Sequence, residues 1–167
     1  EKEGPRPVGS TSQGAHLTRL APHCFTDAER FFSSGAWDML LRASRSDTVF
    51  LSSGWLRAVR ATYANQKDFI GIAIEEDGGW VAAAAFTYTK GILEFLGTGP
   101  SDYLDIVVNA NLSEGDRKAC RQVILAHARR QVPSFRAFRL RNIPRENGVD
   151  DLISNRDYYA TVLRTTP

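Results

Sequence analysis

The sequence predicts an α/β (α+β) domain in which helices flank a mixed, mainly antiparallel sheet. Four short runs rich in β-branched and aromatic residues follow one another with turn signals between them, which is typical of an antiparallel meander. Amphipathic helical patterns precede these runs, and a longer helical pattern and a further strand-like segment follow them. The length of 167 residues suits one domain with a sizeable core.

Charge and composition argue against several classes of protein. The net charge of +2 is too small for the concentrated basic face of a nucleic-acid-binding protein. No apolar run is long enough to span a membrane, and we expect a cytoplasmic protein with reduced cysteines. Cys24 and Cys120 are far apart and no histidine has metal-binding spacing, so we expect no metal. We expect a flexible tail at residues 1–16 and a single domain at residues 17–167.

The first elements are read from local capping signals. We expect a short extended segment within Leu17–Phe25, followed by a helix that Thr26 or Asp27 caps. The polar, glycine-containing stretch Ser33–Gly35 interrupts this helix. Apolar residues on one helical face predict a second helix at about Ala36–Ala43.

A third helix follows a polar break and a short apolar run. Ser52 or Ser53 is a suitable N-cap for it. Its aromatic and aliphatic stripe has four-residue spacing and consists of Trp55, Val59 and Tyr63. We interpret this stripe as core packing rather than as a platform for a ligand.

The sheet is predicted from four runs: Phe69–Ile74, Trp80–Thr89, Ile92–Leu96 and Tyr103–Val108. Turns are expected at Glu75–Gly79 and at Lys90-Gly91. The alanines of the second run also suit a helix, but the preceding turn and the neighbouring β-formers favour a strand.

A long helix and a last group of short elements complete the chain. Ser113, with Asp116 three residues later, approaches a capping box, and Pro133 ends the helix. We interpret His127 as a packed or rim histidine. Ser134–Leu140 is expected to be a strand with a polar, arginine-bearing face; solvation of this face is favoured over anion binding by Arg136, Arg139 and Arg141.

Beyond this strand the signals are weaker. Asn142–Pro144 breaks the strand, Val149–Ser154 suits a helical turn, and Tyr158–Leu163 reads as a last strand.

The loop between the third and fourth runs is the candidate functional site. It consists of Gly97, Thr98, Gly99, Pro100, Ser101 and Asp102. A loop with two glycines and an acid, held between two buried strands, is a suitable place for chemistry. The alternative is a plain hairpin turn in which Asp102 caps backbone N–H groups.

Several segments together resemble a known family. The stretches FLSSGWLRAV, LEFLGTGPSDYLDIVV and FRLRNIP occur in this order, with a Gly-Gly turn before a strand. They resemble the first half of the CelD-like acetyltransferases of the GNAT superfamily, which are linked to cellulose and exopolysaccharide biosynthesis. The resemblance covers about Trp37–Pro144, and GTGPSDYLD is its most specific part. It implies a GNAT-like fold and a tandem layout related to the Fem-type aminoacyl transferases.

The resemblance implies a function for the chain as one half of an enzyme. The chain would be the N-terminal GNAT-like lobe of an acyl-CoA-dependent N- or O-acyltransferase and would line the acceptor side of the cleft. A second lobe, in the same full-length protein or on a separate chain, would bind most of the acyl-CoA or acetyl-CoA. The acceptor would be a small molecule or a saccharide. This chain lacks the Arg/Gln-x-x-Gly-x-Gly/Ala loop that cradles the CoA pyrophosphate, so its cofactor-binding residues stay unassigned and we expect the chain alone to be inactive.

The chemistry of acyl transfer decides which catalytic roles the candidate residues could have. It needs a base that takes a proton from the acceptor and donors that stabilise an oxyanion. Asp102 is the first candidate base and Asp105 the second, while Tyr103 is the candidate acid for the leaving thiolate. The candidate substrate-binding residues are Gly97, Thr98, Gly99 and Ser101. The alternative function is a non-catalytic GNAT-like scaffold or protein-interaction module that uses the terminal strand or the Trp80 sheet face.

Overall fold

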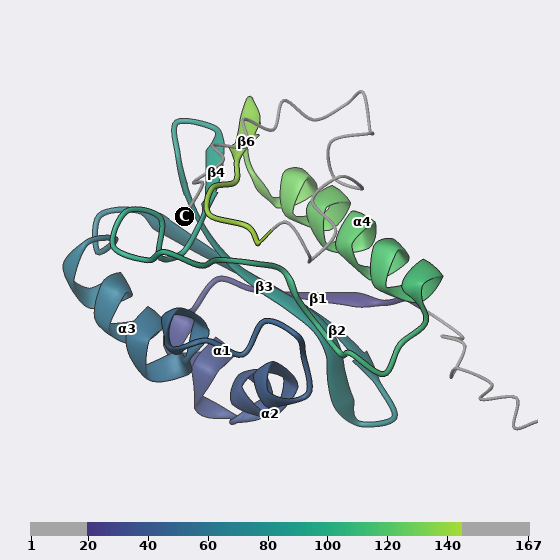
Figure 1. Cartoon of the computed structure of the whole chain (residues 1–167). Helices are drawn as coiled ribbons and strands as arrows, with labels where there is room; N and C mark the ends of the chain where they lie inside the picture. The colour runs from purple at the N-terminus through teal and green to yellow at the C-terminus, as the bar shows by residue number, and fades with distance from the viewer. Residues whose placement is uncertain (1–19, 145–167) are drawn as a thin grey trace, which may run out of the picture.

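The computed structural model describes residues 20–144, which form a six-stranded sheet with helices on both faces (Figure 1). In chain order the elements are β1 (Pro22–Phe25), α1 (Ala28–Ser33), α2 (Ala36–Arg42), the 3-10 helix η1 (Val49–Leu51), α3 (Ser53–Thr62), β2 (Asp68–Glu76), β3 (Gly79–Thr89), β4 (Ile92–Phe95), β5 (Val107–Val108), α4 (Glu114–Gln131) and β6 (Ala137–Arg139). The predicted fold class, a mainly antiparallel sheet flanked by helices, is confirmed. The predicted tail at residues 1–16 and the elements predicted at 149–154 and 158–163 lie outside the described residues.

The sheet has the strand order β1-β2-β3-β4-β6, and β5 pairs with β3 beside this path. All pairs are antiparallel except β4 and β6, which run parallel because α4 carries the chain back across the sheet between them. The two predicted hairpin turns are confirmed. Their central residues, Asp77-Gly78 and Lys90-Gly91, all have positive φ angles, as tight hairpins of this kind require.

Side-chain caps start three helices at positions that the sequence predicted. The side chains of Asp27, Ser52 and Ser113 accept backbone hydrogen bonds from the first turns of α1, α3 and α4. Gly35, with φ 74°, separates α1 from α2, as expected from the polar break. These caps satisfy N–H groups that a helix cannot satisfy itself.

The face of the sheet toward α1–α3 holds an aromatic cluster over small residues. Gly71 and Ala73 of β2 pair with Ala85 and Ala83 of β3, so all four share this face. Above them lie Phe31, Phe32, Trp37, Phe69 and Trp80, whose neighbouring ring centroids are 5.0–6.2 Å apart. A Cβ on Gly71 would lie 2.4 Å from a ring carbon of Phe31, so only glycine fits there. Helix α4 covers the opposite face (Figure 1).

The predicted fourth strand, Tyr103–Val108, is wrong for most of its length. Only its last two residues form β5, which pairs with β3 rather than with β4, so the four-stranded meander does not form. The Leu104 N–H instead donates to the Asn142 carbonyl (3.0 Å), and the Ile106 N–H donates to the side chain of Asp105 (2.8 Å). Because these amides are bound elsewhere, they are not available to a strand ladder.

The predicted core stripe on α3 is partly wrong. Val59 is buried and Trp55 is half-buried, but Tyr63 is 72% exposed. The reason is that α3 ends at Thr62, so Tyr63 is the C-cap and no longer follows the buried face. Leu56, which is 1% exposed, takes the core position instead.

The last helix and strand follow the prediction more closely. His127 is half-buried with its Nε2 3.2 Å from the amide nitrogen of Gln131, so the prediction of a rim histidine is confirmed. β6 is shorter than predicted, and the guanidinium of Arg139 faces the carboxylate of Glu94 on β4 at 3.3 Å. This arginine of the polar strand face thus pairs within the sheet.

Candidate functional site

The predicted glycine loop, residues 97–102, is held in place through Ser101. This residue is 1% exposed, and its Oγ accepts a hydrogen bond from Trp55 Nε1 at 2.9 Å. Its carbonyl accepts from Asn142 Nδ2 at 2.6 Å, and its N–H donates to the Gly97 carbonyl at 3.2 Å. The polar groups of Ser101 are therefore bound inside the protein, and Ser101 fixes the loop to α3 and to the segment after β6.

The two glycines of the loop have different reasons to be glycine. Both have positive φ angles, 117° at Gly97 and 113° at Gly99, which side chains rarely permit. A Cβ on Gly97 would also lie 2.8 Å from Leu104 Cδ2 and 2.9 Å from Ser101 Oγ. A Cβ on Gly99 would meet no atom within 4 Å. Position 97 thus requires glycine because of both its packing and its backbone conformation, whereas position 99 requires it because of the backbone conformation alone.

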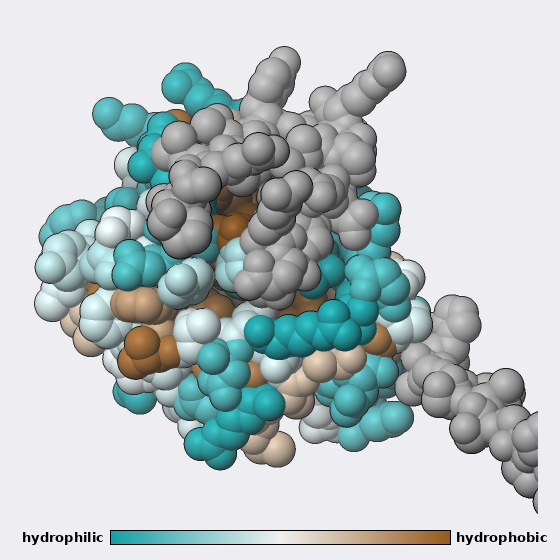
Figure 2. Space-filling model, in the orientation of Figure 1, coloured by the Kyte–Doolittle hydropathy of each residue, from teal (hydrophilic) through white to brown (hydrophobic). Residues whose placement is uncertain are grey.

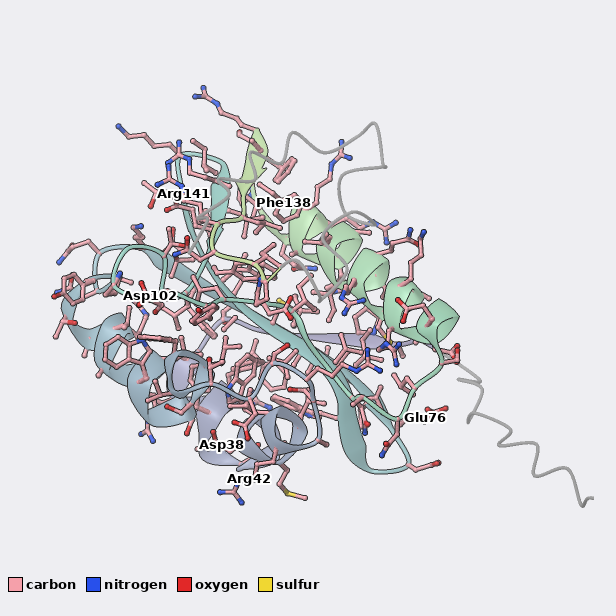
Figure 3. All side chains as sticks on the ribbon, in the orientation of Figure 1. Asp38, Arg42, Glu76, Asp102, Phe138 and Arg141 are labelled. Carbon is pink, nitrogen blue, oxygen red and sulfur yellow. The ribbon has the colours of Figure 1, made fainter. Side chains whose placement is uncertain are left out.

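Asp102 and Thr98 have different surroundings on the glycine loop. Asp102 is exposed on the loop beside α3 (Figure 3), and its side chain forms no hydrogen bond with residues 20–144. The alternative reading of Asp102 as a cap for backbone N–H groups is therefore wrong. Thr98 is half-buried, and its Oγ1 is buried without a hydrogen-bond partner among the described residues.

A cavity of about 240 Å³ lies where the chain returns from the glycine loop toward β5. We call it the Asp105 cavity. Its lining comes from three segments far apart in the sequence: Arg45, Ser46, Thr48, Leu51, Tyr103, Leu104, Asp105 and Pro144. Two of the predicted catalytic residues, Tyr103 and Asp105, line this cavity, and the other, Asp102, does not. The predicted substrate-binding residues of the glycine loop are also not part of its lining.

Asp105 is a buried carboxylate with a fixed orientation. It is 3% exposed, and Ser46, 7% exposed, donates its hydroxyl hydrogen to Asp105 Oδ2 at 2.6 Å. The N–H of Ile106 donates to the other oxygen, Oδ1, at 2.8 Å. A carboxylate oxygen can accept more than one hydrogen bond. Asp105 is thus an oriented hydrogen-bond acceptor among the residues that line the cavity.

The rim of the cavity is aromatic. Tyr103 is 52% exposed, and its ring centroid lies 6.3 Å from that of Phe50. Phe50 in turn packs edge-on against Trp55 at 5.6 Å, which joins the rim to α3 and so to the glycine loop. The cavity thus combines a buried acid with both polar and apolar lining residues, as small-molecule sites commonly do.

The start of α4 does not suit a phosphate group. Helix N-termini attract anions through free N–H groups and the helix dipole. Here Ser113 Oγ already accepts the Asp116 N–H, and the first turn carries the acids Glu114 and Asp116. Their negative charges oppose a pyrophosphate, so the residues described here do not fit CoA at this position.

Metal-binding clusters and membrane-spanning helices are both absent from the described residues. Within residues 20–144, no group of three or more histidine, cysteine or acidic side chains is arranged to hold a metal ion. None of the helices in that part of the chain has the length and apolar character needed to cross a membrane.

Sequence reasoning missed Ser46, Thr48 and Asn142. Ser46 lies 59 residues before Asp105, in a segment that the sequence marks only as a polar break. The available signal was a run of five polar residues between apolar elements, which indicates a loop without showing what the loop approaches. Asn142 adopts φ 62°, a left-handed conformation that asparagine tolerates better than most residues.

Comparisons with models of protein families, with curated proteins and with solved structures found no match to this chain. The likeness to the CelD-like acetyltransferases therefore depends on the residues quoted from the sequence. The acyltransferase function and the cofactor stay predictions.

Proposed function

We propose that this chain is the acceptor-side, GNAT-like lobe of an acyl-CoA-dependent N- or O-acyltransferase. The observation that carries the proposal is the buried carboxylate of Asp105 on the wall of a cavity, with Tyr103 at the rim. Further support comes from the resemblance of the sequence and from the order of helices, antiparallel strands, helix and strand. The second lobe, in the same full-length protein or on another chain, would complete the site.

In this proposal Asp105 is the base of the reaction. Acyl-CoA would supply an activated acyl group, and no contact to it is assigned to this chain because the start of α4 does not fit its phosphates. The hydroxyl or amine of the acceptor donates a hydrogen bond to Asp105, which takes the proton as the acceptor becomes a nucleophile. Ser46 and the Ile106 N–H hold the carboxylate in the required orientation.

Asp105→Asn tests this role in the complete two-lobed protein. The substitution keeps the shape of the side chain and removes its basicity, so we expect acyl transfer to fall by roughly 10²- to 10⁴-fold. The assay follows the release of free CoA from acetyl-CoA across a panel of amines and sugars. Ser46→Ala should lower the rate less, because it loosens the base without removing it. Full turnover by Asp105→Asn would remove Asp105 from the mechanism.

A non-catalytic interaction module is the second candidate. It is favoured by large apolar side chains that reach the surface, namely Met39, Val49, Tyr63 and Tyr103, each at least 52% exposed. Figure 2 shows apolar side chains between polar ones on one face of the molecule. Calorimetric titration of the chain with CoA separates both candidates from a self-sufficient enzyme. Binding by this chain alone would contradict the two-lobe proposal, whereas no binding fits either a half-site or a module.

A further inference from the structure

Strand β1, coloured purple in Figure 1, has a free edge. It is an end strand of the sheet, and within the described part of the chain it pairs with β2 alone. An end strand presents unpaired backbone N–H and C=O groups on its outer side. A concavity of about 230 Å³ lies beside β1, so space is open there. It is lined by His23, Cys24, Phe25, Thr26, Asp27 and Arg30.

The register of the sheet shows which backbone groups of β1 face this edge. On β3, the Ala85 carbonyl accepts a hydrogen bond from the N–H of Leu96, which follows β4 (2.9 Å). Two opposite residues of an antiparallel pair direct their backbone groups either toward each other or both away. Gly71 of β2 is opposite Ala85, so its groups point away from β3 and toward its other partner, Phe25 of β1. Phe25 therefore bonds β2, and the residue before it, Cys24, directs its N–H and C=O to the free edge.

The outer edge of β1 is accessible and lacks the usual protection. His23 and Cys24 are exposed, and no backbone group in residues 20–144 bonds the outward N–H and C=O of Cys24. Proteins commonly protect such an edge with charged side chains, above all lysine. The strand Pro22–Phe25 contains no acidic residue, lysine or arginine, and its proline is at the first position, where a strand tolerates it. A further strand can therefore add to this edge.

We propose that β1 pairs antiparallel with β1 of a second copy of this chain, about a two-fold axis at Cys24, so that the two sheets become one. The two Cys24 residues then exchange N–H···O=C bonds in both directions. In this register the Pro22 carbonyl of each copy lies opposite Thr26 of the other, whose N–H can donate to it. His23 lies opposite Phe25, which adds two side-chain pairs across the axis.

Two features favour a second copy of the chain over an unrelated peptide. A residue on a two-fold axis must offer its own copy both a donor and an acceptor, and Cys24 offers both. Charged side chains near the axis would repel their counterparts in the other copy, and β1 has no acidic residue, lysine or arginine. A strand of four residues gives a small interface, so we expect a weak dimer that forms at high protein concentration. This pairing does not depend on the acyltransferase proposal.

Sedimentation equilibrium and hydrogen exchange of the 167-residue chain test the pairing together. The average mass should rise toward that of a dimer between roughly 10 µM and 1 mM protein, the range expected for a weak complex. Over the same range, exchange of the Cys24 N–H should slow as the fraction of monomer falls, because this N–H is unpaired in the monomer. The Phe25 N–H already bonds β2, so its exchange should change little and serves as the internal control.

Variants at position 24 test the register. Cys24→Pro removes the outward N–H without removing a bond to β2, so it should raise the dissociation constant of the dimer by roughly tenfold or more. Cys24→Ser keeps both backbone groups and should change that constant by less than about threefold. Cys24→Lys and Cys24→Glu place like charges on the axis of each homodimer and opposite charges on the axis of their heterodimer. An equal mixture of the two should therefore associate roughly tenfold more tightly than either variant alone.

The same lysine and glutamate changes at Thr62, which is exposed on α3, are the matched control and should give no such gain on mixing. A monomer at every concentration would overturn the proposal. So would a dimer in which exchange at Cys24 is unchanged, or one that Cys24→Pro leaves intact. Circular dichroism shows whether Cys24→Pro is folded. If it is not, the lysine and glutamate variants at position 24 decide, and an absence of tighter association in their mixture would overturn the proposal.

Discussion

Replacing each glycine of the 97–102 loop by alanine should separate two physical effects. Gly97 and Gly99 have nearly the same φ angle, 117° and 113°, so alanine meets similar backbone strain at both, about 1–3 kcal/mol. Only at Gly97 does the new Cβ also meet packed atoms, with Leu104 Cδ2 at 2.8 Å and Ser101 Oγ at 2.9 Å. Overpacking of this kind costs roughly a further 1–3 kcal/mol. Gly97→Ala should therefore destabilise the fold by about 2–6 kcal/mol and Gly99→Ala by about 1–3 kcal/mol.

Urea unfolding followed by tryptophan fluorescence measures this difference. Trp55 donates a hydrogen bond to the loop through Ser101, so its emission reports on the region that changes. With a urea dependence near 2 kcal/mol per molar, the two midpoints should differ by roughly 0.5–1.5 M. Equal midpoints would show that Gly97 is not packed against Leu104 and Ser101. A neutral Gly99→Ala would show that the backbone conformation of the loop is not the one described.

Three other predictions concern stability and thiol chemistry. Gly71→Ala should lower the urea midpoint, because a Cβ there would lie 2.4 Å from a buried phenylalanine ring. The control Gly54→Ala, on the exposed side of α3, should raise stability by about 0.5–1 kcal/mol. An unchanged midpoint in Gly71→Ala would contradict the packing. Burial raises the pKa of the Cys120 thiol to about 12, while Cys24 is exposed. At pH 8 a thiol reagent such as DTNB should therefore modify Cys24 quickly and Cys120 only on unfolding. Fast modification of both thiols would refute this prediction. Burial, and then the charges of Arg130 and His23, lower the pKa of His127. The contribution of His127 to stability should therefore be constant above its unfolded-state pKa of about 6.5 and fall as the pH drops below that pKa. His127→Gln should reduce this fall between about pH 7.5 and 5.5, and an unchanged slope would contradict the prediction.

Signals that act over a few residues predicted much of the fold. The caps at Asp27, Ser52 and Ser113 and the turns at Asp77-Gly78 and Lys90-Gly91 depend on neighbouring backbone groups, and the structure has all of them. The burial of Trp37, Leu40 and Leu41 on α2 likewise follows from helical periodicity.

The predictions that were wrong or missing concern features that depend on contacts between residues distant in the sequence. The run Tyr103–Val108 has the composition of a strand, but its amides bind Asn142 and the side chain of Asp105, and no local pattern reports such partners. The same holds for the cavity, since Ser46 and Asp105 are 59 residues apart. The sequence singled out Tyr103 and Asp105 but preferred Asp102, because it gave no sign of which acid would be buried.

The ratio of turnover by Asp105→Asn to turnover by Asp102→Asn in the proposed two-lobed protein decides whether Asp105 is the base. Both variants make the same chemical change three residues apart, one in a buried cavity wall and one on the exposed loop. We expect a ratio of roughly 10⁻² or lower, because the proposal places only Asp105 against the acceptor. A ratio near one, or a larger loss in Asp102→Asn, would contradict it.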